Sequence, residues 1–286
     1  IKRVLPGETL IIENAAVVAS HRIKLNVQTA HAAERPVYGD ALAQLDSHLE
    51  NSVAAHIRAD VPTGLFLSGG IDSSVLLSLM SRLSSRPVST LTAAFPGCGS
   101  KDESEKAAHV AKASGADHHQ VDITAADFFR AMPSLAVAMD DPTTDSSALP
   151  IYLLAEAAKQ RGLKVVLSGE GADELFGGYK RYRRATWFFG LWRQKTRTRG
   201  VFRTGDSTLG CLDTWRDGLD RAERAETSPF ISAIQTLQAI DCAEWLPNDL
   251  LLKLDRCLMA HGVEGRTPFL DPVLSPFAYN LPADFK

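Results

Sequence analysis

The sequence LFLSGGIDSSVLLSLMSRL, residues 65–83, decides the fold of this chain. Its first three residues are apolar and predict a short buried strand, and residues 74–83 are apolar with helical spacing. Between them, Ser68–Gly70 is typical of a tight turn, because glycine adopts backbone conformations that other residues avoid. The stretch therefore predicts a strand, a glycine turn and a helix, the first half of a parallel β–α–β unit.

The alternation of strands and helices continues along the chain. We expect strands at residues 88–95, 118–123 and 164–167, and helices at residues 103–113, 125–139 and 148–160. Strands alternating with helices of these lengths imply right-handed crossovers and a parallel sheet with helices on both faces. After about Gly178 the strand signals stop. The predicted fold class is therefore α/β, a parallel twisted sheet followed by a helical C-terminal half.

The residues before this sheet fall into three parts. Ile1–Ala19 contains two apolar runs around Pro6-Gly7, which predicts a hairpin-like pair of strands. Residues 26–40 are polar, with a proline and a glycine, and indicate a linker. Residues 41–58 carry leucines and other apolar residues at helical spacing.

The composition is that of an ordinary soluble globular protein, with 286 residues of which 45% are hydrophobic and 23% charged. A net charge of −3 provides no global basic field for nucleic acid. The four cysteines include no C-x-x-C pair, which argues against a disulfide framework or a zinc ribbon and is compatible with a cytoplasmic location. No apolar stretch suffices for a membrane span. Because the chain begins at Ile1 rather than Met, we expect it to be part of a longer protein.

The loop Leu67–Ser74 has the composition of a phosphate-binding turn. Two glycines allow an anion to approach the backbone, and the following helix offers N–H groups at its N-terminus. No lysine follows the glycines, so the loop is not a Walker A motif. Asp72 would repel a pyrophosphate unless a divalent cation lay between them, which predicts Mg²⁺. The structural alternative is an N-capped helix after a tight turn.

A second unusual loop, Leu167–Tyr179, follows the strand expected at residues 164–167. It contains four glycines and three acids, whereas an ordinary acidic N-cap would account only for Asp173 or Glu174. Two glycine-rich loops at strand ends, each with an acid, favour one nucleotide and metal site with Asp72 and Asp173 as the metal pair.

These residues carry a resemblance to a known family. Ser68–Ser74 resembles the pyrophosphate loop of N-type ATP pyrophosphatases, and Ser168–Tyr179 resembles the matching signature of the glutamine-hydrolysing asparagine synthetase family. Three further segments agree in order: Asp140–Pro142 with Asp145–Ser147, Asp255–Ala260, and Gly262–Asp271. The resemblance runs from about Tyr38 to Lys286 and implies an adenine nucleotide alpha hydrolase-like fold.

The resemblance implies an AMP-forming amide ligase that uses ATP and Mg²⁺. Such an enzyme adenylates aspartate with release of pyrophosphate, and ammonia derived from glutamine then attacks. The residues implied to bind ATP are Leu67, Ser68, Gly69, Gly70, Asp72, Ser73, Ala93, Ser168 and Gly169. Asp72 and Asp173 would bind Mg²⁺, and Glu170 would position or deprotonate the ammonia. Arg266 is a catalytic candidate and Tyr179 a substrate-binding candidate, each with a structural hydrogen-bonding role as the alternative.

The resemblance also implies a domain organisation. Residues 1–25 would be the end of a preceding glutaminase-like domain, 26–40 the linker and 41–286 the synthetase domain. The glutaminase cysteine of the family is not in this chain, and a catalytic lysine is expected beyond Lys286. The partners implied are small-molecule substrates and the glutaminase domain, with neither nucleic acid nor a membrane span; a homodimer is one of the assemblies left open.

Two alternative functions remain. The same adenylation chemistry can serve another substrate, as in β-lactam synthetases, peptide-cyclising enzymes or amidotransferases of other small molecules and polymers. Alternatively, the chain can be a degenerate nucleotide-binding module.

His118-His119 would suggest a metal site, but adjacent residues on a strand point to opposite faces. The aromatic residues of 187–192 and the basic residues of 193–203 are interpreted as a helical core stripe and a solvated loop, rather than as a partner surface and an RNA site.

Overall fold

The computed structural model describes residues 4, 7–23, 25, 35–97, 102–140, 143, 145–182, 217–227 and 231–286. The chain divides into two compact units. Leu42–Ala172 and Asp249–Leu274 form the sheet unit, and Ile1–Ala41, Asp173–Asn248 and Ser275–Lys286 form the helical unit. The assignment of residues 1–25, 26–40 and 41–286 to a preceding domain, a linker and a synthetase domain stays a prediction.

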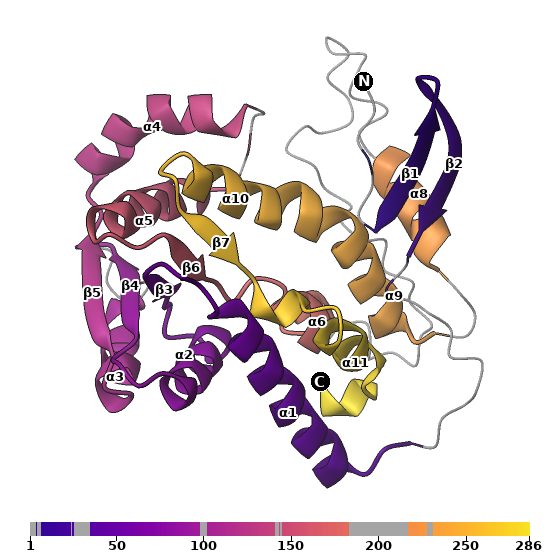
Figure 1. The fold of residues 1–286 in the computed structure, drawn as a ribbon, viewed down its shortest axis with the longest axis horizontal. Coiled ribbons are helices and arrows are strands. Elements are labelled where there is room, and N and C mark those ends of the chain that lie inside the picture. The colour runs from indigo at the N-terminus through magenta and orange to yellow at the C-terminus, as the bar shows by residue number, and fades with distance from the viewer. Residues whose placement is uncertain are drawn as a thin grey trace. The chain divides into compact units, whose positions relative to one another are not determined.

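The sheet unit contains a parallel sheet of five strands (Figure 1). The strands are β3 (Thr63–Phe66), β4 (Ser89–Ala94), β5 (Asp117–Asp122), β6 (Val165–Leu167) and β7 (Glu264–Arg266), in the spatial order β5-β4-β3-β6-β7. Every neighbouring pair is parallel, as expected from the sequence. From β3 the chain adds β4 and β5 on one side and then crosses over to β6 on the other. The loops after β3 and β6 therefore lie at the switch point of the sheet, where open α/β sheets bind ligands.

Helices cover the sheet on both faces. Figure 1 shows α2 (Ile71–Leu83) and α3 (Ser104–Ala113) on one face, and α4 (Ala125–Met139), α5 (Ala148–Gln160) and α10 (Leu251–Met259) on the other. Leu154 of α5 and Leu258 of α10 pack with Leu91 and Val166 of the strands in one core cluster. Helices thus cover both faces of the sheet, which is why its central strands β3, β4 and β6 are largely buried.

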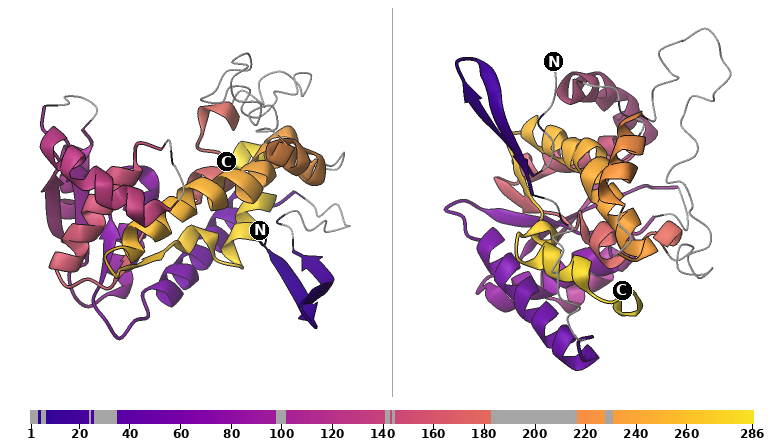
Figure 2. Two further views of the ribbon diagram at one scale, coloured as in Figure 1. Left: turned by 90° about the horizontal axis from the view of Figure 1, so that it is seen from above. Right: turned by 90° about the vertical axis from the view of Figure 1, so that its right-hand side faces the viewer.

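The helical unit begins with an antiparallel hairpin of β1 (Glu8–Glu13) and β2 (Ala16–Arg22), which form a two-stranded sheet in the described part of the chain (Figure 2). Its other elements are α6 (Ala172–Phe176), α8 (Asp217–Glu226), α9 (Ala233–Ile240), the π-helical segment η3 (Asp241–Leu250), α11 (Leu274–Asn280) and η5 (Ala283–Phe285). Tyr182, Ile234 and Leu237 form a buried cluster in this unit. The remaining elements are α1 (Tyr38–His56) and the short 3₁₀ turn η4 (Pro268–Leu270).

Three local predictions were wrong. The hairpin turns at Asn14 and Ala15, both with positive φ, and not around Pro6-Gly7; asparagine tolerates this left-handed conformation better than most residues. Helix α1 begins at Tyr38, before residue 41 where the helix was predicted to start. The strand β7 was missed because its sequence, Glu-Gly-Arg, has little strand propensity and extends only by pairing with β6.

Some predictions concern residues outside those that the structure describes. These are the aromatic cluster at 187–192, the basic run at 193–203, Cys98, Cys211 and the helix break at Asp141-Pro142. Within the described residues, no helix has both the length and the apolarity that crossing a bilayer requires.

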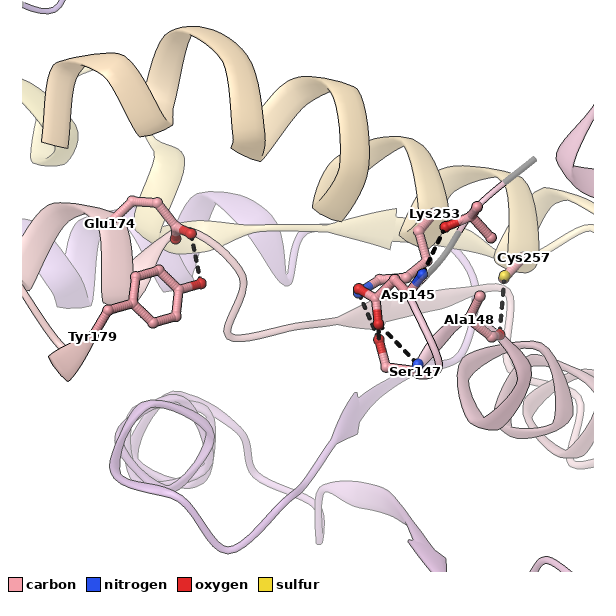
Figure 3. Close-up of polar contacts among 8 residues, drawn as sticks. Asp145, Ser147, Ala148, Glu174, Tyr179, Lys253 and Cys257 are labelled. Carbon is pink, nitrogen blue, oxygen red and sulfur yellow. Dashed lines mark hydrogen bonds and ion pairs between the residues drawn. The ribbon is translucent and has the colours of Figure 1, made fainter. Parts of the chain in front are cut away.

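A buried ion pair fastens the segment before α5 to α10. Lys253 Nζ donates to Asp145 Oδ2 at 2.6 Å and to Ser147 Oγ at 2.7 Å, and the lysine side chain is 3% exposed (Figure 3). Burial alone would raise the pKa of Asp145, but the hydrogen bonds from Lys253 and Ser147 outweigh it, and the pKa is lowered. The pair therefore stabilises the folded sheet unit above the pKa of the unfolded carboxyl, and this contribution is lost as the pH falls through the lower folded value.

We predict that Asp145→Asn lowers the free energy of unfolding by about 3–5 kcal/mol at pH 7, because it leaves a buried ammonium without its counter-charge. Urea unfolding between about pH 5 and pH 2 should show a smaller pH dependence in this variant than in the wild type. The control is Asp117→Asn, since Asp117 is 58% exposed in its pair with Arg161; it should cost about 0–1 kcal/mol. Equal losses in the two variants would contradict this account.

Candidate functional site

The loop between β3 and α2 is anchored by its first residue. The Leu67 N–H donates to the Leu91 carbonyl at 2.9 Å, and its own carbonyl accepts from Thr92 Oγ1 at 2.5 Å. Leu67 and Thr92 are both buried. The chain therefore leaves the sheet at a fixed point beside β4, where Ala93 lies half-buried.

Serine hydroxyls organise the loop itself. Ser73 Oγ accepts from the Ser68 N–H at 3.2 Å and lies 3.1 Å from Ser68 Oγ, and Ser74 Oγ donates to the Gly70 carbonyl at 2.7 Å. The N-cap residue of α2 is Gly70, which makes no side-chain capping hydrogen bond, and its own N–H donates to Ser68 Oγ at 3.3 Å. The first turn of a helix presents N–H groups and the positive end of the helix dipole, which suit an anion.

Gly69 brings this loop against the first turn of α3. It has φ +73°, and a Cβ built on it would lie 2.7 Å from the Ala107 nitrogen and 2.9 Å from Lys106 Cβ. Both the backbone conformation and the space require glycine at this position. The loop is therefore packed against α3 at this glycine.

The second glycine-rich loop contacts the first. Its Ser168 N–H donates to the Arg266 carbonyl of β7 at 2.9 Å. A Cβ built on Gly169 would lie 3.3 Å from Asp72 Cβ and 3.6 Å from the Ser73 nitrogen. The sheet unit thus brings Ser168 and Gly169 together with Asp72 and Ser73 at the switch point, and Glu170 follows half-buried.

Asp173, the other predicted metal ligand, lies half-buried on α6 in the helical unit. Burial raises the pKa of its carboxyl, against the opposing charge of Arg181. A Cβ built on Gly178 would lie 1.8 Å from Asp173 Oδ1, so the carboxylate rests directly on the glycine backbone. Among the described residues, the side chain of Asp173 makes no hydrogen bond.

Magnesium suits such a carboxylate. The described residues contain no group of three or more His, Cys, Asp or Glu side chains that would hold a metal ion. Mg²⁺ is usually held by only one or two carboxylates together with substrate phosphates, so one carboxylate without a hydrogen-bond partner fits it. Asp72 belongs to the sheet unit and Asp173 to the helical unit, and their pairing on one ion stays a prediction.

The two weaker candidates are occupied by structural contacts. Tyr179 donates its hydroxyl to Glu174 Oε1 at 2.7 Å (Figure 3). Arg266 donates to the carbonyls of His56 at 2.7 Å and Arg58 at 2.9 Å, at the end of α1. These contacts favour the structural alternative for both residues, and their substrate and catalytic roles stay predictions.

The histidine pair has separate partners. His118 Nδ1 lies 2.9 Å from Thr90 Oγ1, and His119 Nε2 lies 2.6 Å from Arg161 Nη1. Burial lowers the pKa of His118. The two rings thus face different neighbours, as alternation along β5 requires.

The sequence did not reveal a buried polar network in the helical unit. Arg181 Nη2 donates to Asp241 Oδ2 at 2.7 Å, and the Tyr182 hydroxyl donates to the same oxygen at 2.5 Å. Lys286 Nζ donates to Gln238 Oε1 at 2.9 Å and to the Tyr279 carbonyl at 2.6 Å. The partners are far apart in the sequence, so no local motif marks them.

Fold and loops together define a parallel α/β protein with an anion-binding helix N-terminus at the switch point of its sheet, the arrangement used by nucleotide-binding enzymes. The particular family follows from comparison with known proteins. A family model described as asparagine synthase matches residues 44–286. The chain belongs to the asparagine synthase family.

Individual relatives are longer than this chain. Asparagine synthetase [glutamine-hydrolyzing] 1 of Bacillus subtilis (strain 168) is 28% identical over 325 residues, which cover 100% of this chain and 50% of that protein. Asparagine synthetase B [glutamine-hydrolyzing] of Escherichia coli (strain K12) is 33% identical over 240 residues, which cover 80% of this chain and 35% of that protein. The chain thus spans half or less of the length of these relatives.

Among solved structures, the NH3-dependent NAD synthetase from Campylobacter jejuni has a TM-score of 0.34 and 14% identity, over 76% of this chain and 96% of that one. A similarity of this size carries no argument about fold or function.

We predict that Gly69→Ala destabilises the protein more than Gly115→Ala does. Both glycines have positive φ, but an added Cβ would meet the α3 backbone only at Gly69, whereas nothing lies within 4 Å of it at Gly115. Gly115→Ala should cost about 1–2 kcal/mol from its left-handed conformation alone, and Gly69→Ala should exceed this in denaturant unfolding. Equal costs would show that the loop does not approach α3 as closely as described.

Proposed function

We propose that this chain carries the synthetase part of an ATP-dependent, AMP-forming amide ligase that acts on aspartate. One observation carries the proposal: the N-terminus of α2, which begins after Gly69 and Gly70, is in contact with the second loop at Gly169. Membership of the asparagine synthase family supports the same reading. The activity, substrates and partners of the whole protein belong to this proposal.

The first loop would hold the pyrophosphate end of ATP. Ser68, Gly69, Gly70 and Ser73 offer N–H and hydroxyl donors around the α2 N-terminus, while Leu67, Ala93, Ser168 and Gly169 would line the adenosine. When bound through Asp72 and Asp173, Mg²⁺ would neutralise charge on the departing pyrophosphate. Fixed donors aimed at this developing charge stabilise the transition state without reorganisation.

The reaction would proceed in two balanced steps. A carboxylate oxygen of aspartate attacks the α-phosphorus of ATP, the bond to the β-phosphate oxygen breaks, and pyrophosphate leaves. Ammonia then attacks the acyl carbon, AMP leaves with the carboxylate oxygen, and the nitrogen loses a proton. Glu170, the residue after Gly169, would orient the ammonia and accept that proton.

The ammonia would come from glutamine in a preceding glutaminase domain, as the names of the longer relatives describe for those proteins. The loops concern adenylation and do not identify the acid or the amine, so aspartate is the default substrate. A related carboxylate, or an internal amine in place of ammonia, is the alternative that the following experiment separates.

The full-length protein, incubated with ATP, Mg²⁺, aspartate and ammonia, should release pyrophosphate and form AMP and asparagine in equal amounts. If pyrophosphate release required a different acid or amine, aspartate would not be the substrate, but the adenylation chemistry would stand. If no acid and amine produced pyrophosphate, the proposal would fall in favour of a nucleotide-binding module without activity.

We predict that Glu170→Gln separates the two steps. Adenylation should persist, because the loop donors are unchanged, whereas amide formation should fall by about 10²–10⁴-fold for loss of a general base. Pyrophosphate release in a single turnover and asparagine formation are the two measurements, with ATP binding as the control. Equal loss of both products would contradict the role given to Glu170.

A further inference from the structure

Helix α6 carries Asp173 but is too short to be stable by itself. It spans only Ala172–Phe176, and a helix of one turn needs tertiary contacts because its nucleation cost is not repaid by further turns. Its last carbonyls have no partners within the helix and must find them elsewhere. The position of the Asp173 carboxylate therefore depends on what binds those carbonyls.

Gln238 of α9 supplies the missing partner. Its Nε2 donates to the Glu174 carbonyl at 2.8 Å and to the Leu175 carbonyl at 2.7 Å, and the residue is fully buried. Its Oε1 accepts from Lys286 Nζ at 2.9 Å. The side-chain amide thus uses both donors and an acceptor, and its orientation is fixed by these three hydrogen bonds.

The neighbours of Asp173 on α6 are held as well. Glu174 is 1% exposed, and its carboxylate accepts from the Tyr179 hydroxyl. The Asp173 carbonyl accepts from the N–H groups of Gly177 and Gly178, and its carboxylate rests on Gly178. With the backbone held on both sides, the carboxylate of Asp173 is the polar group of this turn that stays without a hydrogen bond in the described part of the chain.

We propose that Gln238 is a positioning residue for the metal ligand Asp173, acting through its two hydrogen bonds to α6. The inference rests on the proposed function, in which Asp173 binds Mg²⁺. Gln238 does not touch the metal or the nucleotide; it fixes the direction from which the carboxylate approaches them. Partners of this kind, one step removed from a metal ligand, typically change metal affinity by about 10–100-fold when they are removed.

The test measures metal binding, not turnover. Mn²⁺ is titrated calorimetrically into the full-length protein saturated with a non-hydrolysable ATP analogue, and binding of the analogue without metal is measured separately. Gln238→Glu keeps the size of the side chain and the acceptor for Lys286 but removes the two donors. We expect about 10–100-fold weaker Mn²⁺ binding and unchanged binding of the metal-free analogue.

Gln235→Ala is the matched control. Gln235 lies on the same helix and forms the α9 capping box with Ser232, and among the described residues it makes no hydrogen bond to α6. Its loss should cost about 0.5–2 kcal/mol of stability and leave Mn²⁺ binding unchanged. If Gln235→Ala weakened Mn²⁺ binding as much as Gln238→Glu, general destabilisation would explain both and the inference would be overturned.

The remaining outcomes separate the inference from the proposed function. Unchanged Mn²⁺ affinity in Gln238→Glu, with a wild type that binds both nucleotide and metal, would overturn the positioning role alone. A wild type that binds neither would overturn the proposed function and the inference with it. Faster amide hydrogen exchange of residues 172–178 in ligand-free Gln238→Glu would support the inference independently of any ligand.

Discussion

The site depends on backbone segments that approach one another more closely than a side chain would allow. At Gly69 the first loop touches α3, and at Gly169 the second loop touches the residues that begin α2. Each contact lies at the carboxyl ends of central strands, where the topology of the sheet reverses direction. Without a Cβ at these positions, loops from two different β–α units can share one patch of N–H donors. The chemistry proposed for the chain follows from this steric constraint.

Much of the fold could be predicted because its signals are local. Helices at residues 125–139 and 148–160 were predicted at their observed bounds, since helical periodicity and flanking turn residues mark them within the sequence itself. The parallel sheet followed from the alternation of elements. Strand β7 could not be predicted, because its pairing with β6 supplies what its own residues lack. The ion pair of Lys253 could not be predicted either, because its partner Asp145 lies 108 residues away in the sequence.

For the candidate site, the types of residue could be predicted from the sequence, but their hydrogen-bond partners could be predicted less well. The glycines and serines of the two loops indicated an anion site, and the sheet unit does bring them together. Side chains with several hydrogen-bonding options were harder, because their choice depends on neighbours that the sequence does not place. Arg266 donates to the end of α1, and Tyr179 donates to Glu174. An arginine or tyrosine beside a predicted site can therefore serve to donate hydrogen bonds to protein acceptors as well as to bind a substrate.

Burial separates the acids that the second loop carries side by side. Glu174 lies in the interior with a tyrosine hydroxyl as its partner, and burial raises the pKa of its carboxyl. Asp173, one residue earlier, is only half-buried and has no hydrogen bond among the described residues. A bound cation would offset the desolvation of the Asp173 carboxylate, whereas the Glu174 carboxylate already has a hydrogen-bond partner. Of these adjacent carboxylates, Glu174 holds the turn together through Tyr179, whereas Asp173 has no hydrogen bond among the described residues and fits the cation site proposed above.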